Sequence, residues 1–379
     1  MLARTAVTIL AREKVKYVGV VIGVAMSLLL VLLQFGFFLG FQRDITIVGD
    51  SFDADLWVTQ SSLEAFDYVS HFDDLPRMQM LGDEDVLTAT GIIADWARFR
   101  RMTDGATESG YLVGIEFADG VKLDLGTDPS LDLASVLGVP GNVLVDEKHL
   151  DRIAPKAAEK MGLEVFGLHA NVAGTMKGKK LFSTACLLVT GMENARRFLK
   201  LPANRVSYIA VKCRPGADVA AVQARLQAGL PDQRVWTSRE FHELTQSYWI
   251  RLTGIGPVLL LSACLAALVG FLTVFLSFSQ LTAEKMPVYA AMKAMGASTA
   301  ELSGIALLQI GVVFGLGCLI ALAGLMASLA VLAHTTISIV LTPGIALLGV
   351  LFMASCSVAA GMRALLRLAK LEPAEAFRA

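Results

Sequence analysis

The chain contains 379 residues, of which 55% are hydrophobic and only 18% are charged, and its formal net charge at pH 7 is −1. Soluble domains are about 45–50% apolar and about 25% charged, so this composition, with a mean hydropathy of +0.59, excludes a soluble enzyme. The nearly balanced charge excludes nucleic-acid binding through a basic surface.

The N-terminal region indicates a cytoplasmic segment, residues 1–16, followed by a first transmembrane helix over residues 17–41. The segment carries Arg4, Arg12, Lys14 and Lys16 against one acid, Glu13. The apolar stretch that follows is about 24 residues long, against about 7–15 for the core of a signal peptide, and no small-residue cleavage motif follows it. We therefore interpret residues 17–41 as a retained signal anchor.

Residues 42–251 have a mixed composition that predicts an α+β domain between the first two membrane spans. The clearest unit begins with the alternating, β-rich residues 208–213, which Pro215 and Gly216 end. Asp218 is the predicted N-cap of a helix in which Val222 and Leu226 recur at helical spacing. With a second strand at residues 234–237, this predicts a β-α-β unit. Further strands are expected at residues 54–59, 111–117 and 142–145.

No catalytic or cofactor-binding pattern emerges from this domain. The acidic residues near His71 and around Asp83–Asp85 do not repeat with metal-ligand spacing. The run from Gly174 to Lys180 has neither the glycine spacing nor the Ser or Thr of a phosphate loop. We expect no catalytic residue, no metal and no cofactor. Cys186 and Cys213 either pair, if the domain faces an oxidising space, or remain two buried thiols.

Three further transmembrane helices are predicted at residues 252–283, 302–333 and 339–362, because no Asp, Glu, Lys or Arg lies between Arg251 and Glu284 or between Glu301 and Arg363. A loop at 284–301, a short periplasmic connection at 334–338 and a tail at 363–379 complete the chain. Lys and Arg gather in the N-terminal segment, the 284–301 loop and the tail. The positive-inside rule therefore places both termini in the cytoplasm and residues 42–251 outside.

Small residues four apart in the spans predict close helix packing. The pairs are Gly19 with Gly23, Gly36 with Gly40, and Gly311 with Gly315. Gln34 and Gln309 form interhelical hydrogen bonds or line a substrate path. No charged residue lies within a span, so an ion-coupled pump lacks its usual carboxylate and the energy source is expected on another subunit.

The loop at 284–301 is predicted to contain a short amphipathic helix. Pro287 suits a first helical turn, and Val288, Met292 and Met295 then share one face. Gly296 ends this helix, and Ser298 and Glu301 form a capping box that starts the third span. The apolar face either lies on the membrane or docks into a groove of a partner protein.

The motifs at both ends of the C-terminal half resemble the FtsX-like (MacB-type, type VII) ABC transporter permeases. Glu284-Lys285 followed by Met292-Lys-Ala-Met-Gly-Ala-Ser298 is similar to the family's E-R…L-(R/K)-A-(I/L/M)-G-A-S stretch. The tail residues 371–376, with Leu371, Glu372, Pro373 and Glu375, resemble its terminal L-x-P-(A/V)-E-A motif. Pro287-Val288 departs from the family, which has a basic-acidic pair there. Residues 11–15 and 33–36 look closest to the DevC branch.

The resemblance implies an α-helical membrane protein of four transmembrane helices with a MacB-like periplasmic core domain, located in a bacterial inner membrane. It implies a permease homodimer with a separate ATP-binding ABC subunit, and partnership with a periplasmic membrane-fusion adaptor and an outer-membrane channel. Glu284, Lys285, Val288, Met292, Lys293, Met295, Gly296 and Ser298 would then contact the ATPase. The export of a lipid-like or amphipathic substrate is expected. The alternatives are a permease that extracts lipoproteins or lipids, and a regulator of cell-wall hydrolases that transports nothing.

The topology predicts how two introduced cysteines react with a membrane-impermeant thiol reagent. Ser130→Cys, in the large domain, is expected to be labelled from outside the membrane, and Ser298→Cys only after lysis. Labelling of Ser130→Cys only after lysis would contradict the four-span arrangement.

Overall fold

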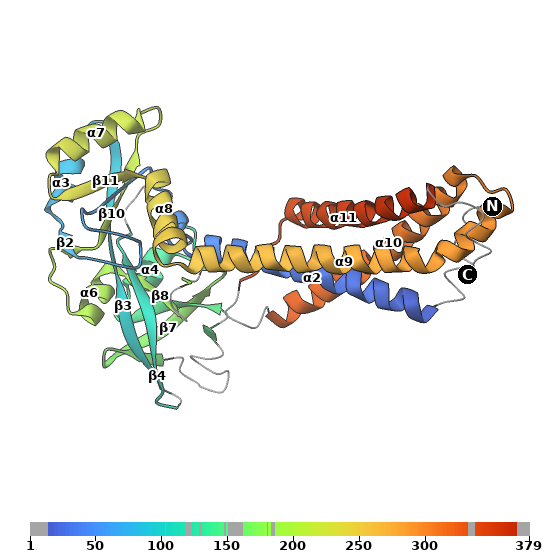
Figure 1. Ribbon diagram of the computed structural model, residues 1–379. Coiled ribbons are helices and arrows are strands. Elements are labelled where there is room, and N and C mark those ends of the chain that lie inside the picture. The colour runs from blue at the N-terminus through green and yellow to red at the C-terminus, as the bar shows by residue number, and fades with distance from the viewer. Residues whose placement is uncertain are drawn as a thin grey trace. The chain divides into compact units, whose positions relative to one another are not determined.

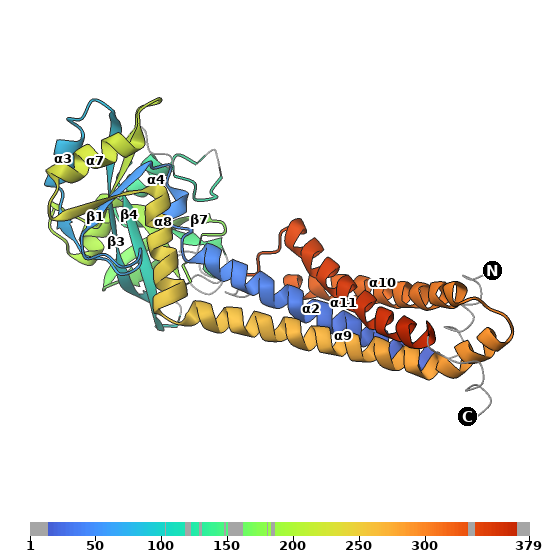
Figure 2. The ribbon, with the colours of Figure 1, turned by 45° about the horizontal axis from the view of Figure 1, so that its top comes forward.

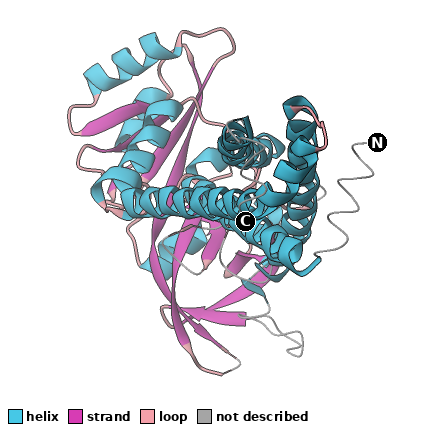
Figure 3. Cartoon of the chain, turned by 45° about the vertical axis from the view of Figure 1, so that its right-hand side comes forward, coloured by secondary structure: helices cyan, strands magenta, loops and turns pink. Residues whose placement is uncertain are grey.

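The computed structural model describes residues 14–102, 104–117, 123–128, 131–147, 149–150, 162–179, 181–182, 186–332 and 338–369. The chain forms two compact units. The first, the helical unit, consists of Met1–Gly40 and Pro257–Ala379, and the second, the sheet unit, consists of Phe41–Gly256. Figure 3 distinguishes the two units by their secondary structure.

The helical unit contains four helices that are long and apolar enough to cross a membrane, as the sequence predicts. Figures 1 and 2 show them as a bundle. Its core is formed by large apolar side chains from all four helices, among them Leu28, Phe278, Val313 and Met353. The helices are α2 (Lys14–Asp44), α9 (Ile255–Ala294), α10 (Thr299–Leu332) and α11 (Pro343–Ala369).

The sheet unit is built on a nine-stranded mixed sheet in the order β11-β1-β10-β3-β4-β8-β5-β7-β6. Because β3 also pairs with β6, six of these strands close into a ring, and β10, β1 and β11 extend from it as an arm. A small second sheet pairs β2 (Phe72–Asp73) with β9 (Arg205–Val206). The strands of the large sheet are β1 (Leu56–Gln60), β3 (Val86–Arg101), β4 (Thr107–Ile115), β5 (Asn142–Asp146), β6 (Gly162–Val165), β7 (Leu168–Met176), β8 (Leu187–Gly191), β10 (Tyr208–Cys213) and β11 (Gln233–Thr237).

Both faces of the sheet are buried. Leu56 and Val58 of β1 join one hydrophobic cluster and Trp57 joins the other, as the alternation of strand side chains requires. The first cluster includes side chains of α6 and α7, and the second includes side chains of α4 and α8. The remaining helices are α3 (Leu75–Met80), α4 (Leu133–Gly138), α6 (Met192–Leu199), α7 (Val219–Gly229), α8 (Ser238–Ser247), and the short turns η1 (Gly49–Ser51) and η2 (Tyr248–Leu252).

The predicted β-α-β unit is present as β10, α7 and β11, but its two strands are not neighbours. Strand β1 lies between them and is antiparallel to both, with Trp57 opposite Ala210 on one side and Trp236 on the other. The Asp218 side chain accepts hydrogen bonds from the first backbone N–H groups of α7, as its N-cap position predicts. The unit is therefore a split β-α-β motif.

Strand β11 is the edge of the arm, and α7 covers its exposed backbone groups. The amide of Gln223 donates to the carbonyl of Val235, and the side chain of Gln227 accepts from the Val235 N–H at 2.9 Å. Satisfied edge groups make a strand a poor template for pairing with another chain.

The two cysteines of the sheet unit, Cys186 and Cys213, are not joined by a disulfide. Both lie in the same hydrophobic cluster. Burial raises the pKa of the Cys213 thiol, which keeps it in its less reactive protonated form. Of the two alternatives left open by the sequence, buried thiols are the one observed.

Asn194 is predicted to stabilise the turn that precedes β5. Its side chain accepts from the N–H of Gly141 at 2.9 Å and donates to the carbonyls of Leu137 and Val139 at 2.9 and 2.8 Å. Asn194→Ala leaves these buried groups unsatisfied, which should lower the free energy of unfolding by about 1–3 kcal/mol. Faster hydrogen exchange of the backbone amides in residues 136–142 is the expected sign that the turn has been destabilised. The side chain of the exposed Asn204 donates to the carboxyl group of Asp73, far from this turn in the sequence, so Asn204→Ala should leave this exchange unchanged.

Candidate functional site

The turn at residues 65–68, here called the Phe66 turn, is tied to the sheet by two tyrosines. The hydroxyl groups of Tyr111 and Tyr208 both donate to the carbonyl oxygen of Phe66, the first at 2.9 Å. Burial raises the pKa of both phenols well above their usual value, so both remain protonated donors. The ring of Phe66 also stacks on Tyr208, with 5.0 Å between the centroids.

The same turn is tied to α8 and η2. Its Phe66 N–H donates to the hydroxyl oxygen of Thr245 in α8 at 3.3 Å. Asp67 is 2% exposed, and its carboxyl group accepts from the indole N–H of Trp249 in η2 at 3.1 Å. Its backbone carbonyl accepts from the indole of Trp96 in β3 at 3.0 Å. The Phe66 turn therefore joins the sheet to the end of α8.

The helix that leaves this junction contains a π-helical turn. Residues Tyr248–Leu252 form η2, and Gly254 follows with φ of +74°, a conformation that favours glycine. Helix α9 begins at the next residue. Single π turns inside helices are frequent at functional sites. Trp249, which bonds the Phe66 turn, lies six residues before the start of α9.

The sequence-based prediction of a separate helix beginning at Pro287 is wrong. Helix α9 continues through Pro287 to Ala294. Proline removes one helical hydrogen bond and costs about 3 kcal/mol in a helix interior. The burial of Lys285, Tyr289 and Ala290 against the bundle offsets that cost, because tertiary packing overrides local propensity.

A polar cluster at this end of α9 lies inside the helical unit. Lys285 is 4% exposed, and its ammonium group lies 5.8 Å from the centroid of the Tyr17 ring of α2. The hydroxyl of Tyr289 donates to the side-chain oxygen of Gln309 in α10 at 3.1 Å. These contacts link three helices. Lys285 therefore contacts its own chain, although the sequence suggested that it faces a partner.

The residues of the predicted apolar face are divided between the interior of the helical unit and its surface. Met292 packs against the cluster formed by Tyr289 and Leu302, whereas Val288 is 44% and Met295 is 80% exposed. Gly296 has φ of +96° and ends the helical segment, and Ser298 and Glu301 form the capping box of α10, with 3.2 Å from the Glu301 N–H to the Ser298 hydroxyl. Glu284 accepts a hydrogen bond from Gln280 one turn earlier.

The glycines proposed for helix packing fall into two groups. A side chain at Gly36 would meet Ile339 at 2.7 Å, one at Gly40 would overlap the carbonyl of Ser338, and one at Gly23 would touch Ser277 at 3.6 Å. At Gly19, Gly311 and Gly315, no atom of the described chain lies within 4 Å of the added carbon.

Some close helix contacts were missed by the sequence pattern. A carbon added to Gly317 would lie 2.6 Å from Val24, and one added to Gly349 would lie 2.8 Å from Leu32, although neither glycine has a glycine partner four residues away. Gln34 donates to the hydroxyl of Ser262, so the interhelical hydrogen bond is the alternative observed for this residue. Gln309 likewise accepts a hydrogen bond across helices, from the hydroxyl of Tyr289.

The tail residues Leu371, Glu372, Pro373 and Glu375 lie outside the described residues.

His71 contacts a serine and an aspartate, but the arrangement is not suited to catalysis. Its ring nitrogens lie 3.0 Å from the hydroxyl of Ser207 and 3.1 Å from the carboxyl of Asp95. Ser207 is 1% exposed, and its hydroxyl also bonds both backbone groups of Ala94. A buried, fully bonded hydroxyl cannot reach a substrate. Among the described residues, no group of three or more His, Cys, Asp or Glu side chains is arranged to hold a metal ion.

Comparisons with known proteins match two family models in succession. Residues 17–228 match the MacB-like periplasmic core domain, and residues 260–373 match the FtsX-like permease C-terminal domain. No curated protein matches the chain.

Three solved structures are similar to about half of the chain. The periplasmic region of MacB from Actinobacillus actinomycetemcomitans is 11% identical, covering 53% of this chain and 95% of that one, with a TM-score of 0.36. The extracellular domain of the noncanonic ABC-type transporter YknZ from Gram-positive bacteria is 13% identical, covering 48% and 99%, with a TM-score of 0.36. A domain of a putative permease from Porphyromonas gingivalis is 15% identical, covering 49% and 89%, with a TM-score of 0.32.

The bond between Trp249 and Asp67 predicts that Trp249→Phe loosens the Phe66 turn. The substitution keeps a ring but removes the N–H donor, so the buried carboxyl group loses a partner at a cost of about 1–3 kcal/mol. Hydrogen exchange in residues 65–68 and 245–252 should become faster. Trp236→Phe is the matched control, because its indole bonds Thr59 instead, at 3.0 Å. Equal effects of the two substitutions on residues 65–68 would contradict the assignment.

Proposed function

This chain belongs to the family of FtsX-like permeases with a MacB-like periplasmic core domain, which are membrane subunits of ABC transporters, and on this premise we propose that it transmits the work of a separate ATPase to its periplasmic domain. In this role the permease transmits a conformational change, whereas ATP is bound and hydrolysed by the partner subunit. The observation that supports this role best is the length of α9.

Helix α9 is 40 residues long without interruption. At 1.5 Å per residue it extends about 60 Å, twice the roughly 30 Å of a bilayer core. A helix of this length reaches beyond the membrane. A continuous helix transmits a displacement better than two helices joined by a loop, because each backbone hydrogen bond resists bending and stretching. The absence of a break at Pro287 therefore favours mechanical transmission.

At the periplasmic end, the Phe66 turn supplies the attachment. A displacement of α9 passes through Gly254 and η2 to Trp249, and from there to the buried carboxyl group of Asp67. The carbonyl of Phe66 passes it to Tyr111 and Tyr208 in two central strands. From Trp249 onward, each step uses a hydrogen bond between buried groups, for which water does not compete.

At the other end, residues at the C-terminal end of α9 and in the turn that follows it are proposed as the ATPase contact. Val288 and Met295 offer apolar surface, and Glu284, Lys293 and Ser298 surround it with polar groups. Met292 and Lys285 act indirectly, since they hold this segment against Tyr289 and Tyr17 of the bundle. Gly296 lets the chain turn into α10. The tail motif at residues 371–376 is proposed to contribute to the same contact.

The remaining parts of the proposal concern the assembly. We place both termini in the cytoplasm of a bacterium, residues 42–251 in the periplasm, and the permease in a homodimer with two ATPase subunits. The periplasmic domains would dock an adaptor that leads to an outer-membrane channel. A lipid-like or other amphipathic molecule is the proposed substrate.

Met295→Asp tests the ATPase contact. Because Met295 is 80% exposed in the isolated subunit, the charge does not disturb the bundle, and only a partner that covers this residue responds. The loss of an apolar interface anchor of about 2 kcal/mol weakens association more than tenfold, at 1.4 kcal/mol per decade. Recovery of the ATPase with the purified permease should fall accordingly.

The matched control is Met78→Asp, which places the same charge at an exposed methionine of α3 in the periplasmic domain. ATPase recovery with this variant should equal that of the wild type. Met292→Asp should reduce recovery and also destabilise the α9–α10 hairpin, because Met292 packs inside it. Undiminished recovery and normal stimulated ATP hydrolysis with Met295→Asp would refute the contact.

A further inference from the structure

Aromatic side chains gather where the sheet unit is connected to the membrane helices. Phe41 lies in the last turn of α2, and Tyr248 and Trp249 lie in η2, which ends three residues before α9 begins. The ring centroid of Phe182 is 4.6 Å from that of Phe41 and 5.9 Å from that of Trp249. The ring centroid of Tyr68 is 5.0 Å from that of Tyr248. Two aromatic residues from distant parts of the chain, Tyr68 and Phe182, therefore lie beside the two connections.

The charge pattern indicates the depth of these connections in the membrane. As helices, the charge-free residues 17–42 extend about 39 Å and the charge-free residues 252–283 about 48 Å, at 1.5 Å per residue. A bilayer with its headgroup layers is about 40–45 Å thick. A span that begins at one surface of the membrane therefore ends in the headgroup layer of the other surface, next to the sheet unit. Phe41 and η2 both lie at this level.

Several large side chains at these connections are exposed. The exposed fractions are 52% for Tyr68, 37% for Phe182 and 75% for Leu252, the last residue of η2. Arg43 and Arg251, which flank the two charge-free stretches, are also exposed. Tyrosine rings are enriched at the headgroup level of membranes because one end of the ring is apolar and the other is polar, and guanidinium groups bind phosphate. This group of side chains therefore suits a phospholipid surface in both its apolar and its charged members.

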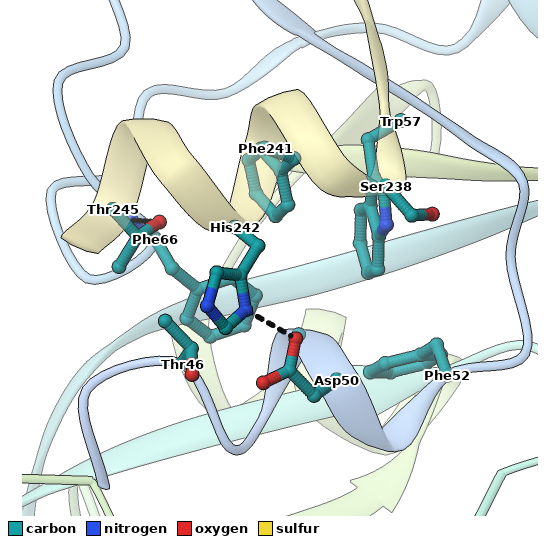
Figure 4. A pocket seen from close by; sticks show the side chains of 10 residues that line it. Thr46, Asp50, Phe52, Trp57, Phe66, Ser238, Phe241, His242 and Thr245 are labelled. Carbon is teal, nitrogen blue, oxygen red and sulfur yellow. Dashed lines mark hydrogen bonds and ion pairs between the residues drawn. The ribbon is translucent and has the colours of Figure 1, made fainter. Parts of the chain in front are cut away.

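The packing behind Tyr68 fixes its position. Tyr68 belongs to the Phe66 turn, and the ring of Phe66 meets that of Phe241 in α8 at 6.2 Å between centroids. Figure 4 shows these two rings beside His242 of α8, which lies 3.0 Å from the carboxyl group of Asp50 in the segment that follows α2. The segment after α2, the Phe66 turn and α8 are thus packed together. Tyr68 therefore cannot move away from the two connections without breaking buried contacts.

We propose that Tyr68, Phe182 and Leu252 insert into the headgroup layer of the membrane and anchor the sheet unit to its surface. The partner is a phospholipid surface, with its phosphate groups at Arg43 and Arg251. An adaptor protein or a second copy of the chain would have to displace lipid to cover side chains at this depth, which favours lipid as the occupant. The proposal needs only that the four apolar helices span a membrane, and it does not rest on the transmission of ATPase work.

The test compares two positions of a fluorine probe in the full-length permease, without the ATPase, in nanodiscs of phosphatidylethanolamine and phosphatidylglycerol. 4-Fluorophenylalanine replaces Tyr68 in one sample and Met78 in the other. Met78 is the matched control, because it is 67% exposed and belongs to α3, which Figures 1 and 2 show away from α8. A nitroxide attached to the lipid near its headgroup, relative to a gadolinium chelate in water, should accelerate ¹⁹F relaxation several-fold more at position 68 than at position 78.

A phospholipid with a photoreactive diazirine in its headgroup provides a measurement on the unaltered chain. Its adducts should map to the peptides that contain Tyr68 and Phe182, as well as to residues 248–252. Adducts confined to residues 41–48, residues 249–256 and the membrane helices would overturn the anchor, because chain connection alone accounts for them. Equal relaxation ratios at positions 68 and 78 would overturn it too. Protection of position 68 from both relaxation agents would show that a second copy of the chain covers it, and would overturn the assignment to lipid.

Discussion

One backbone carbonyl and the carboxyl group beside it join η2 and the end of α8 to the sheet. The carbonyl of Phe66 accepts from two tyrosines, and Asp67 accepts from an indole N–H of η2. Buried polar groups of this kind are stable only when their partners are in place, since an unmade bond in a low dielectric is costly. The Phe66 turn therefore has one well-defined position, and η2, which Thr253 and Gly254 separate from α9, is firmly attached to the domain.

Helix α9 is kept intact through Pro287 by contacts near its C-terminal end. Pro287 weakens it locally, and the burial of Lys285 beside Tyr17 and of Tyr289 beside Gln309 restores what the backbone loses. A lysine enclosed among helices is expensive unless its charge is stabilised, and an aromatic face contributes to that stabilisation. The same contacts determine which side chains remain outside. Met295 is exposed because Met292 and Lys285 are turned towards the bundle.

The sequence predicts those parts of the fold that leave a local pattern. The four spans follow from charge-free apolar runs, and β10, α7 and β11 follow from alternation, the Pro215-Gly216 stop and the Asp218 cap. The position of β1 between β10 and β11 has no local signal, because its partners lie about 150 residues away. The Phe66 turn was missed for the same reason, since Tyr111, Tyr208 and Trp249 are scattered along the chain. Pro287 is a local signal for the start of a new helix, but the prediction was wrong because packing against the bundle keeps α9 continuous through this residue.

The place of β1 has a consequence for biosynthesis. Strand β1 follows closely after the first span, yet both strands that pair with it, β10 and β11, are among the last parts of the domain to be made. While a ribosome completes the intervening segments, β1 is a short hydrophobic strand with two open edges, anchored at the membrane by α2. Such edges promote pairing with other chains. The nascent permease therefore passes through an aggregation-prone interval that ends only when residues 208–237 arrive, just before α9 enters the membrane.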